Sequence, residues 1–232
     1  MSDLFAPCAL IPAYRAEATV GAVVRGSLRH VPRVLVVDDG SPDRTSEAAR
    51  EAGAEVLRLD VNGGKGTALR AGLDRLLARG DPASAPTHVA LLDADGQHDP
   101  DEIPRFLAAY ERDHPGLIVG RRDFREMPAI RRLSNTIGGW ALSTAVGQGI
   151  PDNQSGFRLV GRPLMRALLD SDESGFEFEV EMIARCIALG LPVGWVPIST
   201  IYAGEPSHIR PWRHFTEFVR VTRQARRIVR GG

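Results

Sequence analysis

Short apolar runs alternate with longer segments of helical period along the first half of the chain. This alternation is typical of the strands and crossover helices of a mostly parallel sheet. The pattern predicts strands over residues 8–12, 33–37, 56–59 and 89–92, and helices over residues 19–28, 45–52 and 65–78.

The rhythm becomes less regular after residue 119. Two glycines interrupt the apolar period of residues 130–146, which still reads as a helix. A regular first half followed by an irregular second half indicates a cofactor half and an acceptor half that share one sheet. The pattern predicts further helices over residues 101–113 and 177–189, and strands over residues 117–119, 157–160 and 193–198.

Length and composition fit one α/β domain. A chain of 232 residues that is 43% hydrophobic can bury one substantial core. Its 29 basic residues equal its 29 acidic residues, so no overall field draws it to nucleic acid, which we exclude as a partner. Cys8 and Cys186 lie far apart and fit packing in a reducing compartment.

The N-terminal residues lack the basic stretch and apolar run of a signal peptide, and no run of 18 apolar residues occurs. We therefore expect a protein on the cytoplasmic side that does not cross a membrane by itself.

Acidic residues follow two of the predicted strands. In open parallel sheets the ligand sits beyond the carboxyl ends of the strands, where Asp38 and Asp39 follow one strand and Asp93 and Asp95 another. Carboxylates two positions apart on an extended segment face one point, and two like charges that close need a cation. With the amide of Gln97 nearby, these oxygen ligands favour Mg²⁺ or Mn²⁺ over zinc.

Each of these acids also has a simpler interpretation as a turn or cap residue. The occurrence of two acidic clusters after two strands of one sheet favours a functional site. His98 reads as a solvated loop histidine rather than as a further ligand.

A glycine-rich segment, residues 62–67, opens a helix directly after the third predicted strand. Glycines let a backbone approach a ligand closely, a helix N-terminus favours anions, and Lys65 adds a compact positive charge. The segment resembles a phosphate cradle, although its spacing is neither that of a Walker A loop nor that of a dinucleotide fingerprint. The alternative is an ordinary loop before a well-capped helix.

Four of these motifs together resemble glycosyltransferase family 2: Pro12-Ala13-Tyr14, residues 38–43, Gly64-Lys65-Gly66 and residues 93–98. Later motifs are similar to the branch that contains dolichyl-phosphate mannose synthase and polyprenyl-phosphate glucosyltransferases. These later motifs are residues 152–158, 175–179, 196–198 and 207–209, so the likeness spans nearly the whole chain in the family's order.

The resemblance implies a GT-A fold, which is a single Rossmann-like α/β domain with a mixed, mostly parallel sheet flanked by helices. It also implies an inverting transfer from a UDP- or GDP-sugar with Mg²⁺ or Mn²⁺ as cofactor. By similarity, the base and ribose are held by Pro12, Tyr14, Asp38 and Asp39, the nucleotide lies near Lys65, and the metal binds Asp93, Asp95 and Gln97. Arg122 matches the family's arginine after the fifth strand, and Arg131, Ser134 or Asn135 fall where the family grips phosphates of donor or acceptor.

One position departs from the family. The family usually has Asn-Glu after the tyrosine, whereas this chain has Arg15-Ala16, with Glu17 one place late. The departure indicates that contacts with the donor differ here.

The acceptor decides which catalytic groups are needed. A metal on the diphosphate stabilises the departing nucleotide without proton transfer, and Asp95 is central to that task. A hydroxyl acceptor also needs a general base, for which Asp152 is the candidate. A phosphate acceptor needs only positive groups, and Asp152 would then cap or orient an arginine such as Arg158. A phosphate clamp would come from Arg121, Arg122, Arg131 and Arg132.

The C-terminal tail is strongly basic. Residues 210–230 contain seven arginines and one acid, Glu217, and Trp212, Phe215 and Val219 recur at helical spacing. We divide the chain into a glycosyltransferase domain, residues 1–209, and a basic amphipathic helix, residues 210–232. The helix either lies on an anionic membrane surface or packs on the domain with a solvated arginine face, and the sequence leaves both open.

The leading hypothesis is a glycosyltransferase that moves a monosaccharide from a UDP- or GDP-sugar to a polyprenyl phosphate. We expect it to be cytoplasmic, and peripheral on the inner face of the membrane if the C-terminal helix binds there. One alternative is a family 2 enzyme for a soluble hydroxyl acceptor with Asp152 as base. Another is a catalytically silent membrane adaptor, against which the retention of Asp93, Asp95 and Lys65 argues.

Overall fold

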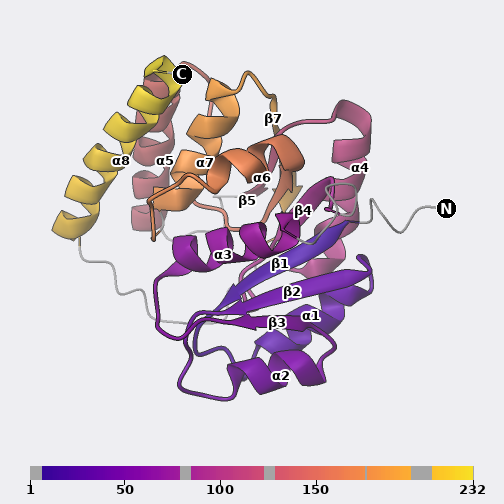
Figure 1. Cartoon of the computed structure of the whole chain (residues 1–232). Helices are drawn as coiled ribbons and strands as arrows, with labels where there is room; N and C mark the ends of the chain where they lie inside the picture. Colours follow the sequence, from indigo (N-terminus) through magenta and orange to yellow (C-terminus); the bar gives the residue numbers. More distant parts are fainter. Residues whose placement is uncertain (1–6, 79–84, 123–128, 176, 200–210, 232) are drawn as a thin grey trace.

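The computed structural model describes residues 7–78, 85–122, 129–175, 177–199 and 211–231, with only the backbone described in the helical stretches 129–137 and 211–219. One seven-stranded sheet has helices on both faces (Figure 1). Its strands are β1 Cys8–Ala13, β2 Arg33–Asp38, β3 Glu55–Arg58, β4 His88–Leu91, β5 Leu117–Arg122, β6 Arg158–Gly161 and β7 Val193–Ile198. The helices are α1 Val20–Leu28, α2 Thr45–Glu51, α3 Lys65–Leu77, the 3₁₀ turn η2 Pro100–Glu102, α4 Ile103–Asp113, α5 Ala129–Val146, α6 Arg162–Leu168, α7 Glu177–Ala188 and α8 Pro211–Gly231.

The sheet has the order β3-β2-β1-β4-β6-β5-β7. Only β6 runs against its neighbours, since it pairs antiparallel with both β4 and β5 while the other pairs are parallel. The expected mixed, mostly parallel sheet is confirmed. The short helix α6 between β6 and α7 was not expected from the sequence.

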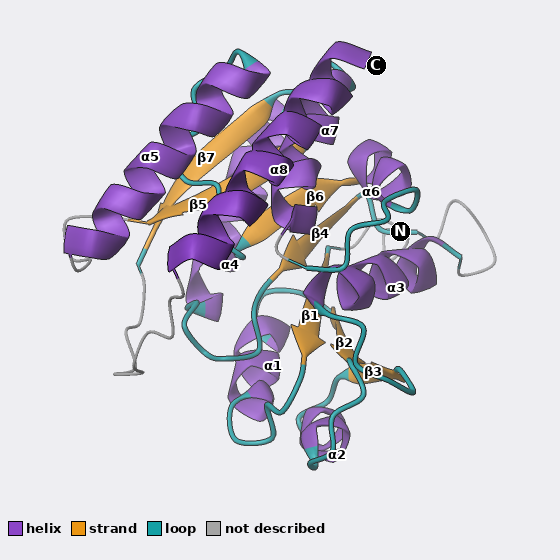
Figure 2. Cartoon of the chain, turned by 90° about the vertical axis from the view of Figure 1, so that its left-hand side faces the viewer, coloured by secondary structure: helices purple, strands orange, loops and turns teal. Residues whose placement is uncertain are grey.

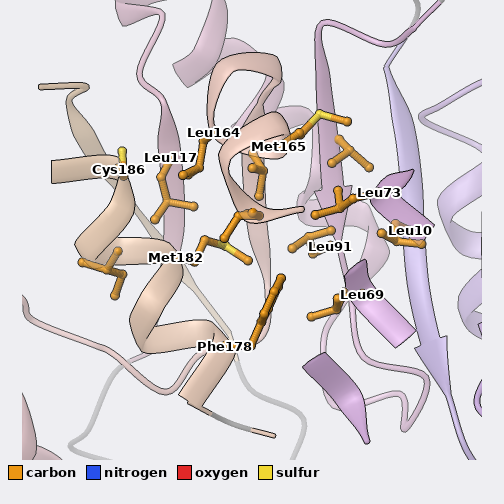
Figure 3. Close-up of a cluster of buried hydrophobic side chains, with 14 of the residues drawn as sticks. Leu10, Leu69, Leu73, Leu91, Leu117, Leu164, Met165, Phe178, Met182 and Cys186 are labelled. Carbon is orange, nitrogen blue, oxygen red and sulfur yellow. The ribbon is translucent and has the colours of Figure 1, made fainter. Parts of the chain in front are cut away.

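Alternate residues of β1 enter two different cores. Leu10 packs on one face with Leu69 and Leu73 of α3 and with Phe178 of α7 (Figure 3). Ile11 packs on the opposite face, among side chains of α1, α2 and α4. Because successive residues of a strand point to opposite faces, one apolar run supplies both layers. Cys8 and Cys186 are both buried and are not joined in a disulfide, as their assignment to packing requires.

Helix α8 packs against α5 and α7 (Figure 2). Val221 and Ala225 are buried, and Ile228 and Val229 pack against the same core. The arginines between residues 220 and 230 are exposed. In this part of the helix the apolar side therefore packs on the domain and the basic side faces solvent. Arg210 and the side chains of Trp212, Phe215 and Val219 lie outside the described residues. No helix within the described ranges is long and apolar enough to span a membrane.

We predict an acid-sensitive contribution to stability from His88. Its ring is buried at the start of β4 beside Tyr110, with ring centroids 4.3 Å apart, and burial lowers its pKa from 6.5 to about 4. The unfolded chain therefore takes up a proton on His88 between pH 6.5 and about 4, while the folded chain stays neutral. The free energy of unfolding should fall by about 3 kcal/mol over that window as the pH decreases.

Urea unfolding at pH 7 and pH 4.5 measures this effect. The His88→Gln variant should lose much of the difference between the two pH values, because glutamine does not titrate. Equal pH dependence in the variant and the original protein would contradict the assignment.

Candidate active site

A cavity of about 610 Å³ opens at the carboxyl ends of β1, β2 and β4. The three strands run parallel side by side, so the residues that follow them meet at one edge of the sheet. Several residues expected at a donor site line this cavity, namely Pro12, Tyr14, Asp39, Lys65, Asp93 and Asp95.

Asp39 fixes the glycine-rich loop to the end of β2. Its carboxylate accepts hydrogen bonds from the amides of Gly63 and Gly64, both at 2.8 Å, and its side chain is 3% exposed. The two amides occupy one lone pair on each oxygen, so the carboxylate keeps acceptor capacity on the cavity side. Asp39 thus lines the cavity and also holds the glycine-rich loop at its edge.

Asp38 does not share this position, contrary to the expectation that it holds the nucleoside. Its side chain is fully buried and accepts hydrogen bonds from the Ser41 amide at 2.9 Å, the Ser46 hydroxyl and the Arg58 guanidinium at 2.8 Å. Adjacent residues at a strand end point to opposite sides, so only one of the two acids can face the cavity. Asp38 braces β2 against β3 and α2.

Lys65 begins α3, and its ammonium is paired with two carboxylates of the chain. Its Nζ forms an ion pair with Asp93 and a second with Glu179, at 2.7 Å. Burial lowers the pKa of Lys65, but the charges of Glu179 and Asp93 outweigh burial and hold the pKa above its usual value. Lys65 is therefore a charged link between α3, the segment after β4 and α7.

In the expected phosphate cradle, one backbone amide is already hydrogen-bonded to a carbonyl of the chain. The Gly66 amide, in the first turn of α3, donates to the carbonyl of Ser174 at 2.7 Å. Gly64 has φ +91, and a Cβ atom there would lie 2.5 Å from the same carbonyl oxygen. Glycine is required here because the segment 171–175 packs directly on the start of the helix. The first turn of α3 thus has an internal acceptor, and the cavity reaches it only through Gly64, Lys65 and Ala68.

Asp93 and Asp95 face the same cavity, although the chain between them is not extended. Ala94 and Asp95 form a turn, so the expected extended segment between the two carboxylates is wrong. Both aspartates nevertheless line the cavity, as expected. Asp95 is exposed, and its Oδ1 accepts from the Gln97 amide at 2.9 Å. Gln97 thus orients Asp95 through its backbone.

The surroundings of Asp93 keep it ionised. Burial raises its pKa, but the charge of Lys65 and the hydrogen bond from His98 outweigh burial, so the pKa lies well below its ordinary value. The His98 ring is buried, 3.6 Å from the Asp93 carboxylate, and stands against Phe157. His98 is therefore not the solvated loop histidine that the sequence favoured.

The donor set fits a divalent cation that arrives together with a nucleotide. No group of three or more His, Cys, Asp or Glu side chains within the described ranges is placed to hold a metal alone. Mg²⁺ and similar ions are commonly bound by one or two carboxylates, with substrate phosphates and water completing the shell. Asp93 and Asp95 supply that number of carboxylates, and the cavity leaves room for a diphosphate.

On the side of β5, Asp152 forms a bidentate pair with Arg122. The guanidinium donates at 2.8 Å and 3.0 Å to the two carboxylate oxygens, and the Arg122 amide donates at 3.2 Å. The Gln154 amide adds a contact at 3.1 Å, and Asp152 is 2% exposed. Asp152 therefore orients Arg122 and not Arg158, which is fully buried and donates to backbone carbonyls instead.

Arg131 and its neighbours remain predictions. The backbone of α5 includes residue 131, but the side chains of Arg131, Arg132, Ser134 and Asn135 lie outside what the structure describes. Arg121 is exposed at the end of β5.

Arg15, at the position that departs from the family, lies on the cavity wall. Its backbone has φ 53 and its guanidinium stands 5.4 Å from the centroid of the exposed Tyr14 ring. Ser41 and Thr45 hold the backbone amides of Arg15 and Ala16. Glu17 accepts from the Arg44 amide at 2.9 Å and so contacts the start of α2.

Sequence reasoning assigned no role to Glu179, although its motif formed part of the resemblance. Glu179 and Glu181 are both 4% exposed on a helix whose other buried positions are mostly apolar. An acid on the apolar side of a predicted helix is the signal that would have singled it out, because buried carboxylates need a partner.

The family model described as Glycosyl transferase family 2 matches residues 8–168. An undecaprenyl-phosphate mannosyltransferase of Micrococcus luteus is 32% identical over 207 residues, covering 83% of this chain and 82% of the relative. A polyprenol monophosphomannose synthase of Mycolicibacterium smegmatis is 31% identical over 210 residues, covering 82% and 75%.

A similar solved structure is the glucosyl-3-phosphoglycerate synthase of Mycobacterium tuberculosis in complex with Mn²⁺, UDP-glucose and glycerol 3-phosphate. Its TM-score is 0.64 at 20% identity, with 96% of this chain and 78% of that chain covered. This likeness shows a shared fold, the GT-A fold.

We predict that Gly64 and Gly96 respond differently to alanine. Both have positive φ, +91 and +76, but a Cβ atom at Gly96 meets nothing within 4 Å. Gly96→Ala should lower the free energy of unfolding by about 1 kcal/mol, the cost of the left-handed conformation. Gly64→Ala should cost about 3 kcal/mol or more, because the Ser174 carbonyl must move as well.

Urea unfolding of both variants measures the two costs. Equal losses would show that the segment 171–175 is not tightly seated on α3.

Proposed function

The chain belongs to glycosyltransferase family 2, and we propose that it transfers a monosaccharide from a UDP- or GDP-sugar to a polyprenyl phosphate with inversion at the sugar. The chain is a glycosyltransferase, as its family match and its named relatives establish. The observation that carries the proposal is the cavity that brings Asp39, Asp93 and Asp95 together at the ends of parallel strands.

On the donor side, we propose that the nucleoside occupies the wall formed by Pro12, Tyr14 and Asp39. Asp39 offers acceptor oxygens to hydroxyl or N–H groups, and the exposed Tyr14 ring with the adjacent Arg15 guanidinium offers a flat surface for a base. The diphosphate then lies toward Asp93 and Asp95. Arg15 takes a place in the donor wall that the family usually gives to asparagine.

Asp93 and Asp95 would hold a divalent ion against the diphosphate, and this arrangement supports the proposal of a metal-dependent reaction. Such an ion, when bound, neutralises the charge that develops on the departing nucleotide. The similar Mycobacterium tuberculosis structure contains Mn²⁺ with UDP-glucose. The Gln97 amide holds Asp95 in place, and Lys65 supplies a nearby positive charge.

On the acceptor side, the pairing of Asp152 with Arg122 supports a phosphate acceptor. Both of its oxygens are engaged by Arg122, so this carboxylate is poorly placed to take a proton from a hydroxyl group. A phosphate is already anionic and needs positioning by positive groups instead. The names of the two relatives specify polyprenol or undecaprenyl-phosphate acceptors. We place Arg122 in this role, with Arg131 as its proposed partner from α5.

We predict transfer of label to an organic-soluble product when the protein receives labelled UDP- or GDP-sugars, polyprenyl phosphate and Mg²⁺ or Mn²⁺. Asp95→Ala should lower the rate by at least about a hundredfold and leave the melting temperature unchanged, because it removes a charge at the developing leaving group. Chelation with EDTA should abolish transfer.

The matched control is Asp113→Ala, which removes an exposed acid paired with Arg112 at the end of α4. Its rate should stay within twofold of the original protein, roughly the effect of an isolated surface change. Label that appears only on a soluble hydroxyl acceptor would replace the proposed acceptor, and full activity of Asp95→Ala would remove the metal from the mechanism.

We also propose that the exposed basic side of α8 contacts an anionic membrane surface. Deleting the helix would expose the core beneath Val221 and Ala225, so charge removal is the cleaner test. Near an anionic surface each arginine contributes about 1 kcal/mol. The quadruple variant should therefore bind phosphatidylglycerol vesicles at least about tenfold more weakly at low salt; its substitutions are Arg223→Gln, Arg226→Gln, Arg227→Gln and Arg230→Gln.

Vesicle sedimentation measures this binding. A control with the same charge change uses exposed arginines of other elements: Arg29→Gln, Arg44→Gln, Arg50→Gln and Arg112→Gln. Equal weakening in both variants would mean that net charge, and not the α8 surface, accounts for vesicle binding.

A further inference from the structure

The ammonium of Lys65 lies between two carboxylates that come from different halves of the chain. Asp93 follows β4 and lines the cavity, whereas Glu179 belongs to α7 and is not among the cavity-lining residues. The Glu179 side chain is 6% exposed, against 25% for Asp93. One partner of Lys65 therefore faces the proposed donor, and the other lies behind it.

Glu179 is held in position from several sides. The buried guanidinium of Arg158 donates to its carbonyl at 2.5 Å, and the next residue back, Phe178, sits in the core. Gly156 closes the space next to Lys65, since a Cβ atom there would lie 2.9 Å from Nζ. The ammonium thus lies close to both carboxylates and to the backbone at Gly156.

The link between Lys65 and Asp93 opposes the binding of a cation at Asp93. The ammonium occupies an oxygen that a metal ion would use, and two positive charges so close together repel each other inside a protein. A metal can bind Asp93 readily only if the ammonium has another carboxylate to pair with. Glu179 is within hydrogen-bond distance of Nζ for that purpose.

We propose that Glu179 is a positioning residue that retains Lys65 when a divalent cation and nucleotide occupy Asp93 and Asp95. The proposal rests on the proposed metal site and deepens it. Without the charge of Glu179, Lys65 would pair with Asp93 alone and would compete with the cation. Glu179 thus keeps Asp93 available, although it does not touch donor or metal.

The test measures the dissociation constant of Mn²⁺ in the presence of saturating UDP or GDP, by electron paramagnetic resonance of free Mn²⁺ on the full chain. Glu179→Gln keeps the shape of the side chain and removes its charge, so it should raise the Mn²⁺ dissociation constant about tenfold, within the range of coupling between contacting groups. Glu181→Gln changes an equally buried acid of α7 that pairs with Arg185, and it should change the constant less than twofold.

The Lys65→Met background separates competition from a simple loss of negative charge. With no ammonium present, adding Glu179→Gln should change the Mn²⁺ constant less than twofold. Glu179→Asp keeps the charge, so its Mn²⁺ dissociation constant should stay within threefold of that of the original protein. This variant and the melting curves of all variants control for misfolding.

An unchanged constant in Glu179→Gln, or an equal tenfold effect in the Lys65→Met background, would overturn the role of Glu179 alone. A weakening in Glu179→Asp as large as in Glu179→Gln would overturn it too. Failure of the original protein to bind Mn²⁺ with either nucleotide would overturn the metal site and this inference together.

Discussion

Buried negative charge at the carboxyl ends of β2 and β4 is the constraint around which the site is organised. Asp38 is compensated by Arg58, Asp39 by two loop amides, and Asp93 by Lys65. Arg58 lies on β3, whereas the two amides and Lys65 lie where the glycine-rich loop enters α3, so compensating the acids also joins β3 and the start of α3 to the strand ends. Since an unpaired buried carboxylate is costly, these links determine the shape of the cavity as well as its charge.

The same pairing connects the two halves of the chain. Lys65 reaches Glu179 across 114 positions, and the Gly66 amide reaches Ser174. Helix α8 adds to this junction, because Arg220 pairs with Glu173, within the segment 171–175 that packs on α3, and with Glu177 at the start of α7. A basic tail that reads as a separate element in sequence is therefore in contact with the segments that pack behind the cavity.

The sequence predicted the regular first half well, because each buried parallel strand is a short apolar run that ends in a recognisable turn. It also indicated that Asp39, Lys65, Asp93 and Asp95 are neighbours, since residues that follow parallel strands meet at one edge of a sheet. Strand alternation could have separated Asp38 from Asp39, because adjacent side chains point to opposite faces.

The remaining features depend on contacts between distant residues. Nothing near Asp152 in sequence indicates that its partner is Arg122 and not Arg158, since the choice follows from the antiparallel insertion of β6 beside β5. The buried position of Glu179 likewise follows from how α7 packs on α3. Sequence motifs therefore located the residues that line the cavity, whereas the ionisation and pairing of these groups became evident only from the fold.

The central claim is that Asp93 and Asp95 bind a metal-nucleotide while Lys65 remains paired with Glu179. A crystal structure with Mn²⁺ and the preferred nucleoside diphosphate, with data collected at the manganese absorption edge, tests it most directly. We expect one anomalous peak bonded to a carboxylate oxygen of Asp93 or Asp95 and to the diphosphate, with the Lys65 ammonium on Glu179. A manganese peak remote from both aspartates, or an unbroken pair between Lys65 and Asp93 beside the bound metal, would contradict the account.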